Sequence, residues 1–273
     1  MNTVDENAAV GRAGEPLPLS VAVITLNERD NLPRCLDSVA PLAGEIVVVD
    51  SGSTDGTVEL ATNYGARVLH RDWPGHVAQK NRALEACSEP WVLCLDADEP
   101  LSSELAENLR DLFSRGDPPL DGYLVNRRTF YLGDWIRHAW YPEWRLRLVR
   151  RSASPRWQGR DPHDFLTVQG RTARLRGDLL HYSYRDLEDH FTRTVRYARI
   201  GADELVRQGR PFRWYKLLLS PWARLVRSLV IKQSWRDGWR GVIIAGSSMF
   251  AAFLKYAFVL EAELASRRRR KEE

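Results

Sequence analysis

Two aspartates one residue apart, Asp96 and Asp98, have the types and spacing to do chemistry. They follow an apolar run at residues 91–95 that predicts a buried strand. Residues two apart on a strand project from the same face, so both carboxylates can reach one ligand. Neighbouring anions repel each other unless a cation lies between them, and Mg²⁺ or Mn²⁺ takes oxygen ligands, including phosphate oxygens. The pair therefore predicts a metal and diphosphate site, although strand ends are often acidic simply because loops are wet.

Alternating strands and helices precede the two aspartates and must position them. Apolar runs rich in β-branched residues predict strands at residues 19–26, 45–50, 66–69 and 91–95. Helical patterns fall between these runs, at residues 32–39, after the turn at residues 51–57, and at residues 77–86. Asp30 or Asn31 can cap the first helix. This alternation predicts an α/β fold with a mostly parallel sheet.

In open parallel sheets, ligands bind at the carboxyl ends of the strands. The predicted strand ends carry the polar residues Thr25, Asn27, Glu28, Asp50, Ser51, Ser53, Asp96 and Asp98. Neither the Gly-x-Gly-x-x-Gly fingerprint after the first strand nor the Gly-x-x-x-x-Gly-Lys-Ser/Thr phosphate loop occurs in the sequence. The pattern therefore disfavours a dehydrogenase or a P-loop kinase.

Four motifs in order resemble family 2 glycosyltransferases, in particular the bacterial lipopolysaccharide core enzymes. They are Val23-Ile24-Thr25-Leu26-Asn27-Glu28, residues 48–57, Gln79-Lys80-Asn81 and Asp96-Ala97-Asp98. The resemblance covers roughly residues 18–260. It implies a GT-A fold with a Rossmann-like sheet, a nucleotide-sugar donor, a divalent cation (Mg²⁺ or Mn²⁺) and inversion at the anomeric carbon. Uridine is the default base, with ADP-, GDP- and dTDP-sugars as alternatives.

The resemblance also implies roles for single residues. Asp98 would bind the metal directly, and Asp96 would face the ribose or the metal's water ligands. The donor-binding residues would be Thr25, Asn27, Glu28, Asp50, Ser53, Lys80, Asn81 and Asp96. Turn chemistry after a strand is the alternative for Thr25 and Asp50, and a solvated helix lysine is the alternative for Lys80.

Inversion requires a base that removes the proton of the acceptor hydroxyl. The segment at residues 157–164 is similar to the family segment that returns to the active site with a histidine and an acid, which implies Asp164 as the base. Many relatives carry Glu at that place, and Asp161 is the rival. His163 and His181 are candidate accessory residues, each with an ordinary structural role as the alternative.

The second half of the chain is strongly basic. Residues 131–273 hold 29 Lys and Arg against 15 Asp and Glu, whereas residues 1–130 hold 11 against 21. Apolar and cationic residues recur at helical spacing over residues 214–232, and a second apolar helix is predicted at residues 242–264, followed by a basic tail. We expect a helical hairpin that lies in the cytoplasmic leaflet of an anionic membrane in preference to a span, with packing on the catalytic domain as the alternative.

These observations predict a flexible leader at residues 1–17, a catalytic domain at residues 18–205 and C-terminal amphipathic, membrane-associating helices at residues 206–273. The leader lacks the apolar core of a signal peptide, and three cysteines without metal spacing suit reduced thiols. We therefore expect a cytoplasmic protein, peripheral on the inner face of the cytoplasmic membrane.

The function predicted from the sequence is metal-dependent, inverting transfer of a sugar to a hydroxyl of a lipid-linked or lipopolysaccharide-core saccharide. A polyprenyl-phosphate sugar transferase of the same fold is one alternative, and it would need no strong base. A nucleotidyltransferase is the second, but its Gly-rich basic first loop is missing. A non-enzymatic basic module that binds membrane or nucleic acid is the third; it leaves the clustered acids unexplained, and no nucleic acid is expected as a partner.

Overall fold

The computed structural model describes residues 14–160 and 163–272, which form two compact units. The first unit comprises the described residues up to Arg128 together with Glu143–Tyr182, and the second comprises Thr129–Pro142 and the chain from Ser183 onward. The boundary lies after Tyr182 and not after residue 205 as expected, because helix α5 (Leu187–Arg207) packs against the last helix of the chain. Most of the expected leader lies outside the described residues, and strand β1 already begins at Leu17.

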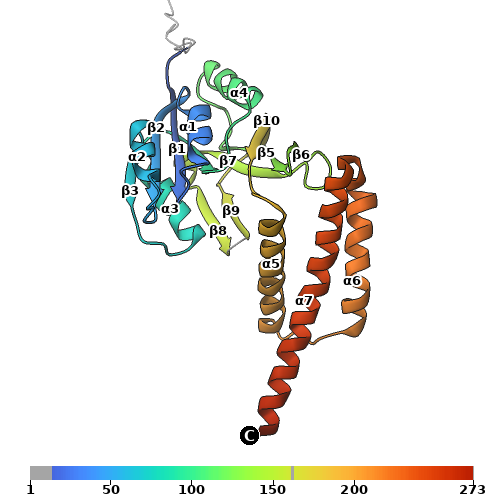
Figure 1. Cartoon of the computed structure of the whole chain (residues 1–273). Helices are drawn as coiled ribbons and strands as arrows, with labels where there is room; N and C mark the ends of the chain where they lie inside the picture. The colour runs from blue at the N-terminus through green and yellow to red at the C-terminus, as the bar shows by residue number, and fades with distance from the viewer. Residues whose placement is uncertain (1–13, 161–162, 273) are drawn as a thin grey trace, which may run out of the picture. The chain divides into compact units, whose positions relative to one another are not determined.

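A mixed sheet in the order β10-β5-β7-β4-β1-β2-β3 forms the centre of the first unit (Figure 1). Its strands are β1 (Leu17–Thr25), β2 (Ala43–Asp50), β3 (Arg67–His70), β4 (Trp91–Asp96), β5 (Gly122–Tyr131), β7 (Trp144–Arg150) and β10 (Thr172–His181). Strands β1 to β4 pair in parallel, which confirms the predicted α/β architecture. Strand β7 then runs antiparallel to both β4 and β5, which the alternation of strands and helices did not predict.

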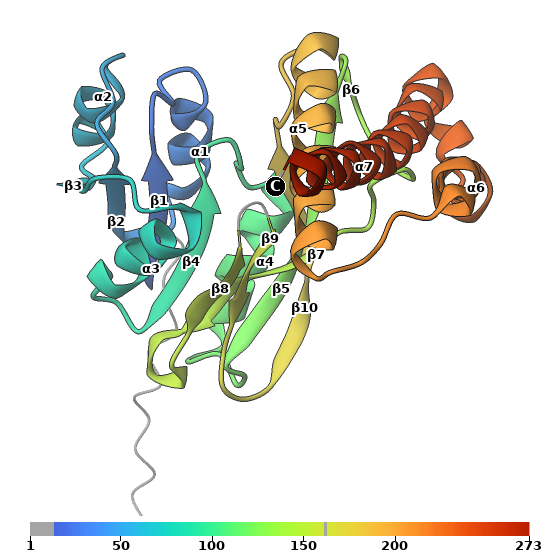
Figure 2. The same ribbon diagram turned by 90° about the horizontal axis from the view of Figure 1, so that it is seen from below.

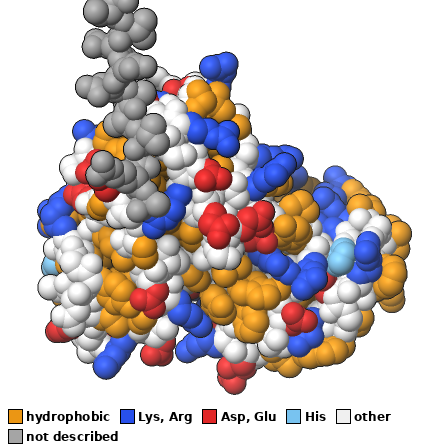
Figure 3. All heavy atoms as spheres, turned by 90° about the horizontal axis from the view of Figure 1, so that it is seen from above, with side chains coloured by type: hydrophobic (Ala, Val, Ile, Leu, Met, Phe, Trp, Pro, Cys, Tyr) orange, Lys and Arg blue, Asp and Glu red, His pale blue; other side chains and the backbone are white. Residues whose placement is uncertain are grey.

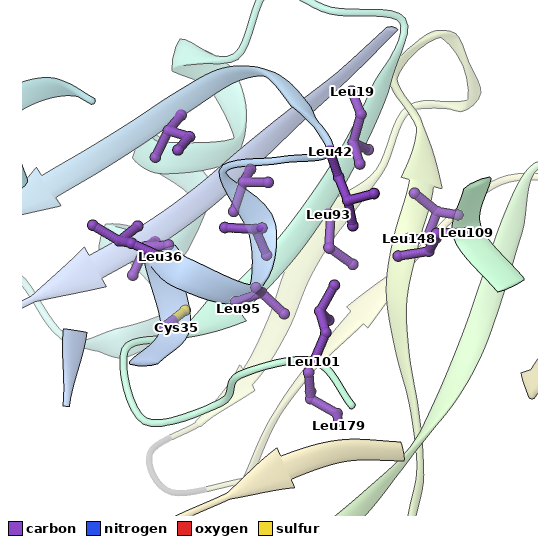
Figure 4. Packing of buried hydrophobic residues seen from close by; sticks show 14 of the residues in the cluster. Leu19, Cys35, Leu36, Leu42, Leu93, Leu95, Leu101, Leu109, Leu148 and Leu179 are labelled. Carbon is purple, nitrogen blue, oxygen red and sulfur yellow. The ribbon is translucent and has the colours of Figure 1, made fainter. Parts of the chain in front are cut away.

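Helices cover both faces of this sheet. Residues of α1 (Leu32–Val39), α2 (Thr57–Asn63) and α4 (Ser103–Ser114) form one hydrophobic core with the sheet, part of which is drawn in Figure 4. Helix α3 (His76–Ala86) and the hairpin of β8 (Arg156–Arg160) and β9 (His163–Thr167) form the second core on the other face. A short 3₁₀ helix, η1 (Arg151–Ala153), joins β7 to this hairpin.

Strand β4 contributes to both cores. Its side chains alternate between the two faces of the sheet, and this alternation decides on which face the last residue, Asp96, lies. Trp91, Leu93 and Leu95 belong to the first core, whereas Val92 and Cys94 belong to the second. Because the side-chain period of a strand is two, the following Asp96 continues the face that carries α3 and the β8–β9 hairpin. The end of β4 therefore faces residues far away in the sequence.

The helix α1 begins where predicted, but its cap differs from the prediction. Asn31 occupies the cap position, yet its backbone is already helical and its side chain makes no cap hydrogen bond. Its Nδ2 instead donates to the Glu28 carboxylate at 2.9 Å, while the carbonyl of Glu28 accepts from the backbone N–H of Leu32. The oxygen that could cap the helix, Asn31 Oδ1, instead accepts from Arg34 Nη2 at 2.6 Å, which explains the lost cap.

The second unit is a group of three long helices. It contains α5, α6 (Trp214–Val226) followed by a π-helical turn η2 (Arg227–Ile231), the 3₁₀ turn η3 (Ser234–Asp237) and α7 (Gly238–Glu272). Both α5 and α6 pack against α7, which lies between them in Figures 1 and 2. The two predicted C-terminal helices are confirmed, but α7 is longer than expected.

The segment Thr129–Pro142, which contains strand β6 (Asp134–Trp135), is fastened to the turn before α7. The carboxylate of Asp237 accepts hydrogen bonds from the backbone N–H groups of Arg137, His138 and Ala139 at 2.8–3.0 Å. These bonds hold the pKa of Asp237 below its usual value against the opposing effect of burial. Asp237 is therefore fully engaged as a structural anion.

Candidate active site

The turn after β2 is organised around Asp50. Its Oδ1 accepts from the hydroxyls of Thr25 and Ser53, and its Oδ2 accepts from the backbone N–H groups of Gly52 and Ser53 at 2.8 and 2.9 Å. Burial opposes the charge, but these hydrogen bonds outweigh it and lower the pKa of Asp50. Because protein donors already occupy both oxygens, the structure favours the turn role of Thr25 and Asp50 over direct contact with a nucleoside.

The loops after β1 and β2 are joined to each other. The backbone N–H of Asn27 donates to Ser53 Oγ at 2.8 Å, and Asn27 Oδ1 accepts from the backbone N–H of Thr54 at 2.9 Å. Asn27 has a φ of +56°, a left-handed conformation that asparagine tolerates better than most residues. The backbone N–H of Glu28 donates to Thr57 Oγ1 at 2.9 Å. The two loops thus hold Asn27, Glu28 and Ser53 together at the carboxyl edge of the sheet, as the sequence predicted.

Lys80 on α3 joins two carboxylates that are far apart in the sequence. Its Nζ lies 2.8 Å from Asp96 Oδ1 and 2.8 Å from Asp164 Oδ2, and 4.4 Å from the centre of the Trp157 ring. Only 9% of the Lys80 side chain is exposed, so the positive charge is held by these partners. Burial lowers its pKa, but the two carboxylates outweigh this and raise it. The structure therefore brings the predicted base Asp164 to the predicted Asp-x-Asp motif through a shared lysine.

Asn81, the neighbour of Lys80, holds the backbone of the β8–β9 hairpin. Its Nδ2 donates to the carbonyl of Trp157 at 3.0 Å, and its Oδ1 accepts from the N–H of the same residue at 2.9 Å. Both polar atoms of the side chain are used in this way. Asn81 thus serves to place the strand that leads to Asp164, and this favours a structural role over contact with a donor.

A buried ion-pair network lies under the Asp-x-Asp motif, and sequence reasoning missed it. Arg147 Nη2 lies 3.1 Å from Asp96 Oδ2 and 2.7 Å from the Glu99 carboxylate, and neither Arg147 nor Glu99 is more than 4% exposed in its side chain. Glu99 also accepts the backbone N–H of Asp96 at 3.1 Å. Burial opposes the charge of Asp96, but Lys80 and Arg147 outweigh it and hold its pKa well below the usual value. Asp96 is thus held between two cations, Lys80 and Arg147.

A second arginine extends the network. Arg127 donates two hydrogen bonds to Glu143, from Nε at 2.8 Å and from Nη2 at 3.0 Å, and its Nη1 lies 3.3 Å from Glu99. Burial opposes the charge of Glu143, but Arg127 outweighs it and lowers the pKa of Glu143 to about 2. One feature of the sequence could have indicated this network: two arginines, Arg145 and Arg147, stand at alternate positions in the apolar strand β7.

Asp98 differs from Asp96 because like charges surround it. Burial raises its pKa, and the nearby carboxylates of Glu99, Asp96 and Glu28 raise it further, to about 7. Its side chain is 23% exposed. Arg127 opposes these effects only in part, and a divalent cation would compensate the charge that remains.

His181 stands next to Asp98 because the end of β10 pairs with the segment that follows β4. The backbone N–H of Tyr182 donates to the carbonyl of Asp98 at 3.1 Å, and that of Leu180 donates to the carbonyl of Pro100 at 2.8 Å. His181 Nε2 consequently lies 3.5 Å from Asp98 Oδ2. Burial, with a smaller effect of Arg127, lowers the pKa of His181 to about 3, so the imidazole is neutral. Its Nδ1 is buried without a hydrogen-bond partner.

A carboxylate with an unbalanced charge beside a neutral imidazole fits a divalent metal ion. Within residues 14–160 and 163–272, no group of three or more His, Cys, Asp or Glu side chains is arranged to hold such an ion. The chain would thus contribute Asp98 and His181, leaving other positions to phosphate oxygens and water, as is common for Mg²⁺. His181 was only an accessory candidate in the sequence, and its place beside Asp98 depends on the β10 pairing.

Two predicted residues lie wholly or partly outside the described part of the chain. Asp161, the rival base, lies outside the described residues, and so does the side chain of His163, whose backbone belongs to β9. The choice of Asp164 therefore rests on its own position beside Lys80, where 15% of its side chain is exposed.

Comparison with known proteins identifies the family. The model of glycosyl transferase family 2 matches residues 20–173, more than half of the chain. The chain belongs to glycosyl transferase family 2. It is 34% identical over 256 residues to the lipopolysaccharide core biosynthesis glycosyltransferase LpsC of Rhizobium meliloti (strain 1021), covering 90% of this chain and 93% of that protein. It is 30% identical over 259 residues to an uncharacterised glycosyltransferase of Rickettsia typhi, covering 91% and 89%.

A solved structure supports the fold of this glycosyltransferase. The mannosyltransferase PcManGT from Pyrobaculum calidifontis, in complex with GDP-Man and Mn²⁺, superposes with a TM-score of 0.52 over 90% of this chain and 88% of that one, at 15% identity. The predicted GT-A fold is thereby confirmed. Family membership also decides against the nucleotidyltransferase and the non-enzymatic binding module, because the chain is a glycosyltransferase.

Proposed function

We propose that this glycosyltransferase moves a sugar from a nucleotide-sugar donor to a hydroxyl of a lipid-linked or lipopolysaccharide-core saccharide, with inversion and with Mg²⁺ or Mn²⁺. The observation that carries the proposal is the pairing of Asp98 with neutral His181 at the carboxyl edge of β4. The name of the relative LpsC supports the class of acceptor. The GDP-Man and Mn²⁺ in the PcManGT complex support the class of donor and the cation.

Asp98 and His181 would hold the metal ion. When bound, such an ion stabilises the negative charge that develops on the departing nucleoside diphosphate. Asp96 would remain in its ion pairs with Lys80 and Arg147, where it keeps the neighbouring strand end in place. The exposed Asn27 and half-buried Glu28 at the adjacent strand end offer oxygen acceptors for ribose hydroxyls or base N–H groups. Uridine remains the default base.

Asp164 would be the base. The acceptor oxygen forms a bond to the anomeric carbon, the bond from that carbon to the diphosphate oxygen breaks, and the hydroxyl proton passes to Asp164. Lys80 occupies Oδ2 of Asp164 at 2.8 Å, so Oδ1 is the oxygen we assign to the proton. Lys80 would thus orient the base. To contact the diphosphate directly, Lys80 would have to break its ion pair with Asp96 or with Asp164.

The experiment is a transfer assay with a lipid extract as acceptor and UDP-, GDP-, ADP- and dTDP-sugars as donors. We expect metal-dependent release of one nucleoside diphosphate, and a product whose anomeric configuration, read by NMR, is inverted relative to the donor. Asp164→Asn should lower kcat by about 100-fold or more. Asp111→Asn is the matched control, because Asp111 is exposed on α4.

Three outcomes would contradict parts of the proposal. Retention of configuration would exclude single-displacement transfer, and full activity in a chelator would exclude the metal. Activity that survives Asp164→Asn with a polyprenyl phosphate as acceptor would support the alternative, since a phosphate acceptor needs no strong base.

We further propose that the enzyme works at the inner face of the cytoplasmic membrane, where a lipid-linked acceptor would be found, and that nucleic acid is not a partner. The basic C-terminal helices support this location through their charge. An exposed surface of α6 allows the membrane contact to be specified.

A further inference from the structure

One stretch of the second unit presents large apolar side chains to solvent. Among the described residues, every large apolar side chain that is more than half exposed lies between residues 214 and 242. We call this set the α6 surface. Its members, exposed by 54–72%, are Trp214, Tyr215, Leu218, Leu219, Trp222, Val226, Val230, Ile231, Trp235, Trp239 and Val242. Such a concentration marks an interaction site, because single exposed apolar residues are scattered on ordinary surfaces.

The helical repeat of α6 explains this surface. Leu217 and Pro221 are buried against the rest of the unit, whereas Leu218, Trp222 and Val226 follow each other at intervals of four and point outward. A helix on the surface of a soluble domain has its apolar stripe inward and its polar face outward. In α6 apolar side chains occupy both sides, so its outer face is suited to an apolar environment.

The charges around the α6 surface indicate which partner it fits. Between residues 210 and 260 the only acid is Asp237, which is occupied by three backbone N–H groups. The same stretch carries the cations Arg210, Arg213, Lys216, Arg224, Arg227, Lys232, Arg236, Arg240 and Lys255. On the face of the molecule drawn in Figure 3, Lys and Arg side chains lie next to hydrophobic ones, with Asp and Glu side chains also present. Trp, aliphatic residues and cations without acids match the headgroup layer of an anionic bilayer, whereas charged residues are depleted at the centre of protein interfaces.

A groove of about 530 Å³ adjoins the α6 surface where η2 turns toward α7. It is lined by Leu229, Val230, Gln233, Trp235 and Arg236. An arginine and a tryptophan beside aliphatic side chains can take the phosphate and the first carbons of a lipid headgroup. The groove thus has the same apolar and basic character as the α6 surface.

Helix α7 is long and apolar enough to cross a membrane, with a mean hydropathy of 1.8 in its best window. Its packing argues against a span. Arg199 of α5 forms an ion pair with Glu261 at 2.6 Å and lies 3.7 Å from the centre of the Phe258 ring, and Gly201 of α5 faces the Lys255 side chain. Eight of the 21 residues of α5 are charged. Because so many charged residues make α5 unstable in hydrocarbon, α7 cannot enter the bilayer core while α5 stays packed against it.

We propose that the α6 surface binds in the plane of an anionic bilayer, with α7 from residue 243 onward as a scaffold that does not cross the membrane. The inference names the membrane partner in the proposed function, but it rests on the second unit alone. A negative result for the donor site would therefore leave the test of membrane binding unaffected.

The test uses the full chain and vesicles of phosphatidylcholine, with or without an equal part of phosphatidylglycerol, in a flotation assay. The variant is Leu218→Ser, Leu219→Ser, Trp222→Ser, and its matched control is Val195→Ser, Val206→Ser, Leu264→Ser, which removes three apolar side chains elsewhere in the same unit that are 40–48% exposed. We expect the variant to partition at least about tenfold more weakly than the parent. The control should bind anionic vesicles like the parent, and high salt should weaken binding of both.

Trp222→Ser alone, a change at a side chain that is 57% exposed, keeps the test decisive if the triple variant folds poorly; its partitioning should fall about threefold. Equal binding by variant and control, or no preference for phosphatidylglycerol, would overturn the proposal. Carbonate-resistant retention of the natural protein in cell membranes would show a span and overturn it as well. A parent that ignores vesicles but dimerises through the α6 surface would assign that surface to a second copy of the chain.

Discussion

Replacing Asp98 by asparagine should make the metal-free protein more stable at alkaline pH. The pKa of Asp98 is raised from 3.8 to about 7 by burial and by Glu99, Asp96 and Glu28. An acid with a raised pKa in the folded state holds its proton more tightly there than in the unfolded chain. Stability is therefore lost as the pH rises from about 4 to about 7, and the loss is complete above that window.

The size of this effect follows from the raised pKa. A rise from 3.8 to about 7 corresponds to about 4 kcal/mol. Because 23% of the Asp98 side chain reaches solvent, we expect screening to leave roughly half of this, about 2 kcal/mol. For a chain of this size, that is a difference of about 4 °C or more in Tm.

The assay is thermal unfolding of the parent and Asp98→Asn in a chelator, between about pH 4 and about pH 8. The variant should melt higher at the alkaline end, and the two Tm values should converge at the acidic end. Asp111→Asn, the exposed control on α4, should follow the parent throughout. A gap that is independent of pH, or a variant that melts below the parent in alkaline chelator, would refute the reasoning, since either result means that Asp98 carries no buried, uncompensated charge.

Three further predictions concern the supporting residues. Lys80→Met should cost about 3 kcal/mol of unfolding free energy in denaturant titrations, because two largely buried carboxylates lose their shared cation; a loss below about 1 kcal/mol would contradict this ion pairing. Asn81→Ala should cost about 2 kcal/mol through the two hydrogen bonds to Trp157 while the Kd for a nucleoside diphosphate stays unchanged; a weakened Kd at full stability would restore its donor role. Burial raises the pKa of Glu143, but Arg127 outweighs it and lowers the pKa to about 2, so the charged Glu143 should stabilise the fold and this stability should be lost as the pH falls from about 4.5 to about 2. If the Glu143→Gln protein loses the same stability in acid, Glu143 is not the cause of that loss.

The parallel half of the sheet was predictable because each of its strands is a continuous apolar run followed by polar residues. Residues Thr25, Asp50 and Asp96 end three such runs, and the structure brings their loops to one edge as expected. Local pattern was sufficient here, since parallel strands covered on both faces carry an unbroken apolar signal.

The network below the motif was not predictable by the same reasoning. Arg147 and Glu99 meet only because β7 inserts antiparallel beside β4, and no local pattern announces that pairing. His181 reaches Asp98 through the pairing of β10 with the segment after β4, about eighty residues away in sequence. In the sequence, a polar residue such as Asn81 is equally compatible with binding a ligand and with hydrogen bonding to the backbone. Only the position of Trp157 in the structure shows that Asn81 bonds to the backbone.

Nucleotide binding with and without Mn²⁺ tests the central claim most directly. UDP, GDP, ADP, CDP and dTDP would be titrated into the parent, Asp98→Asn, His181→Gln and the control Asp111→Asn, with binding read by calorimetry and by the shift in Tm. We predict that one diphosphate binds tightly only with metal, that both site variants lose this binding, and that the control keeps it. At a hundred times the Kd the ligand should add about 2.7 kcal/mol of stability. Metal-independent binding, or binding that survives both site variants, would contradict a metal and diphosphate site built on Asp98 and His181.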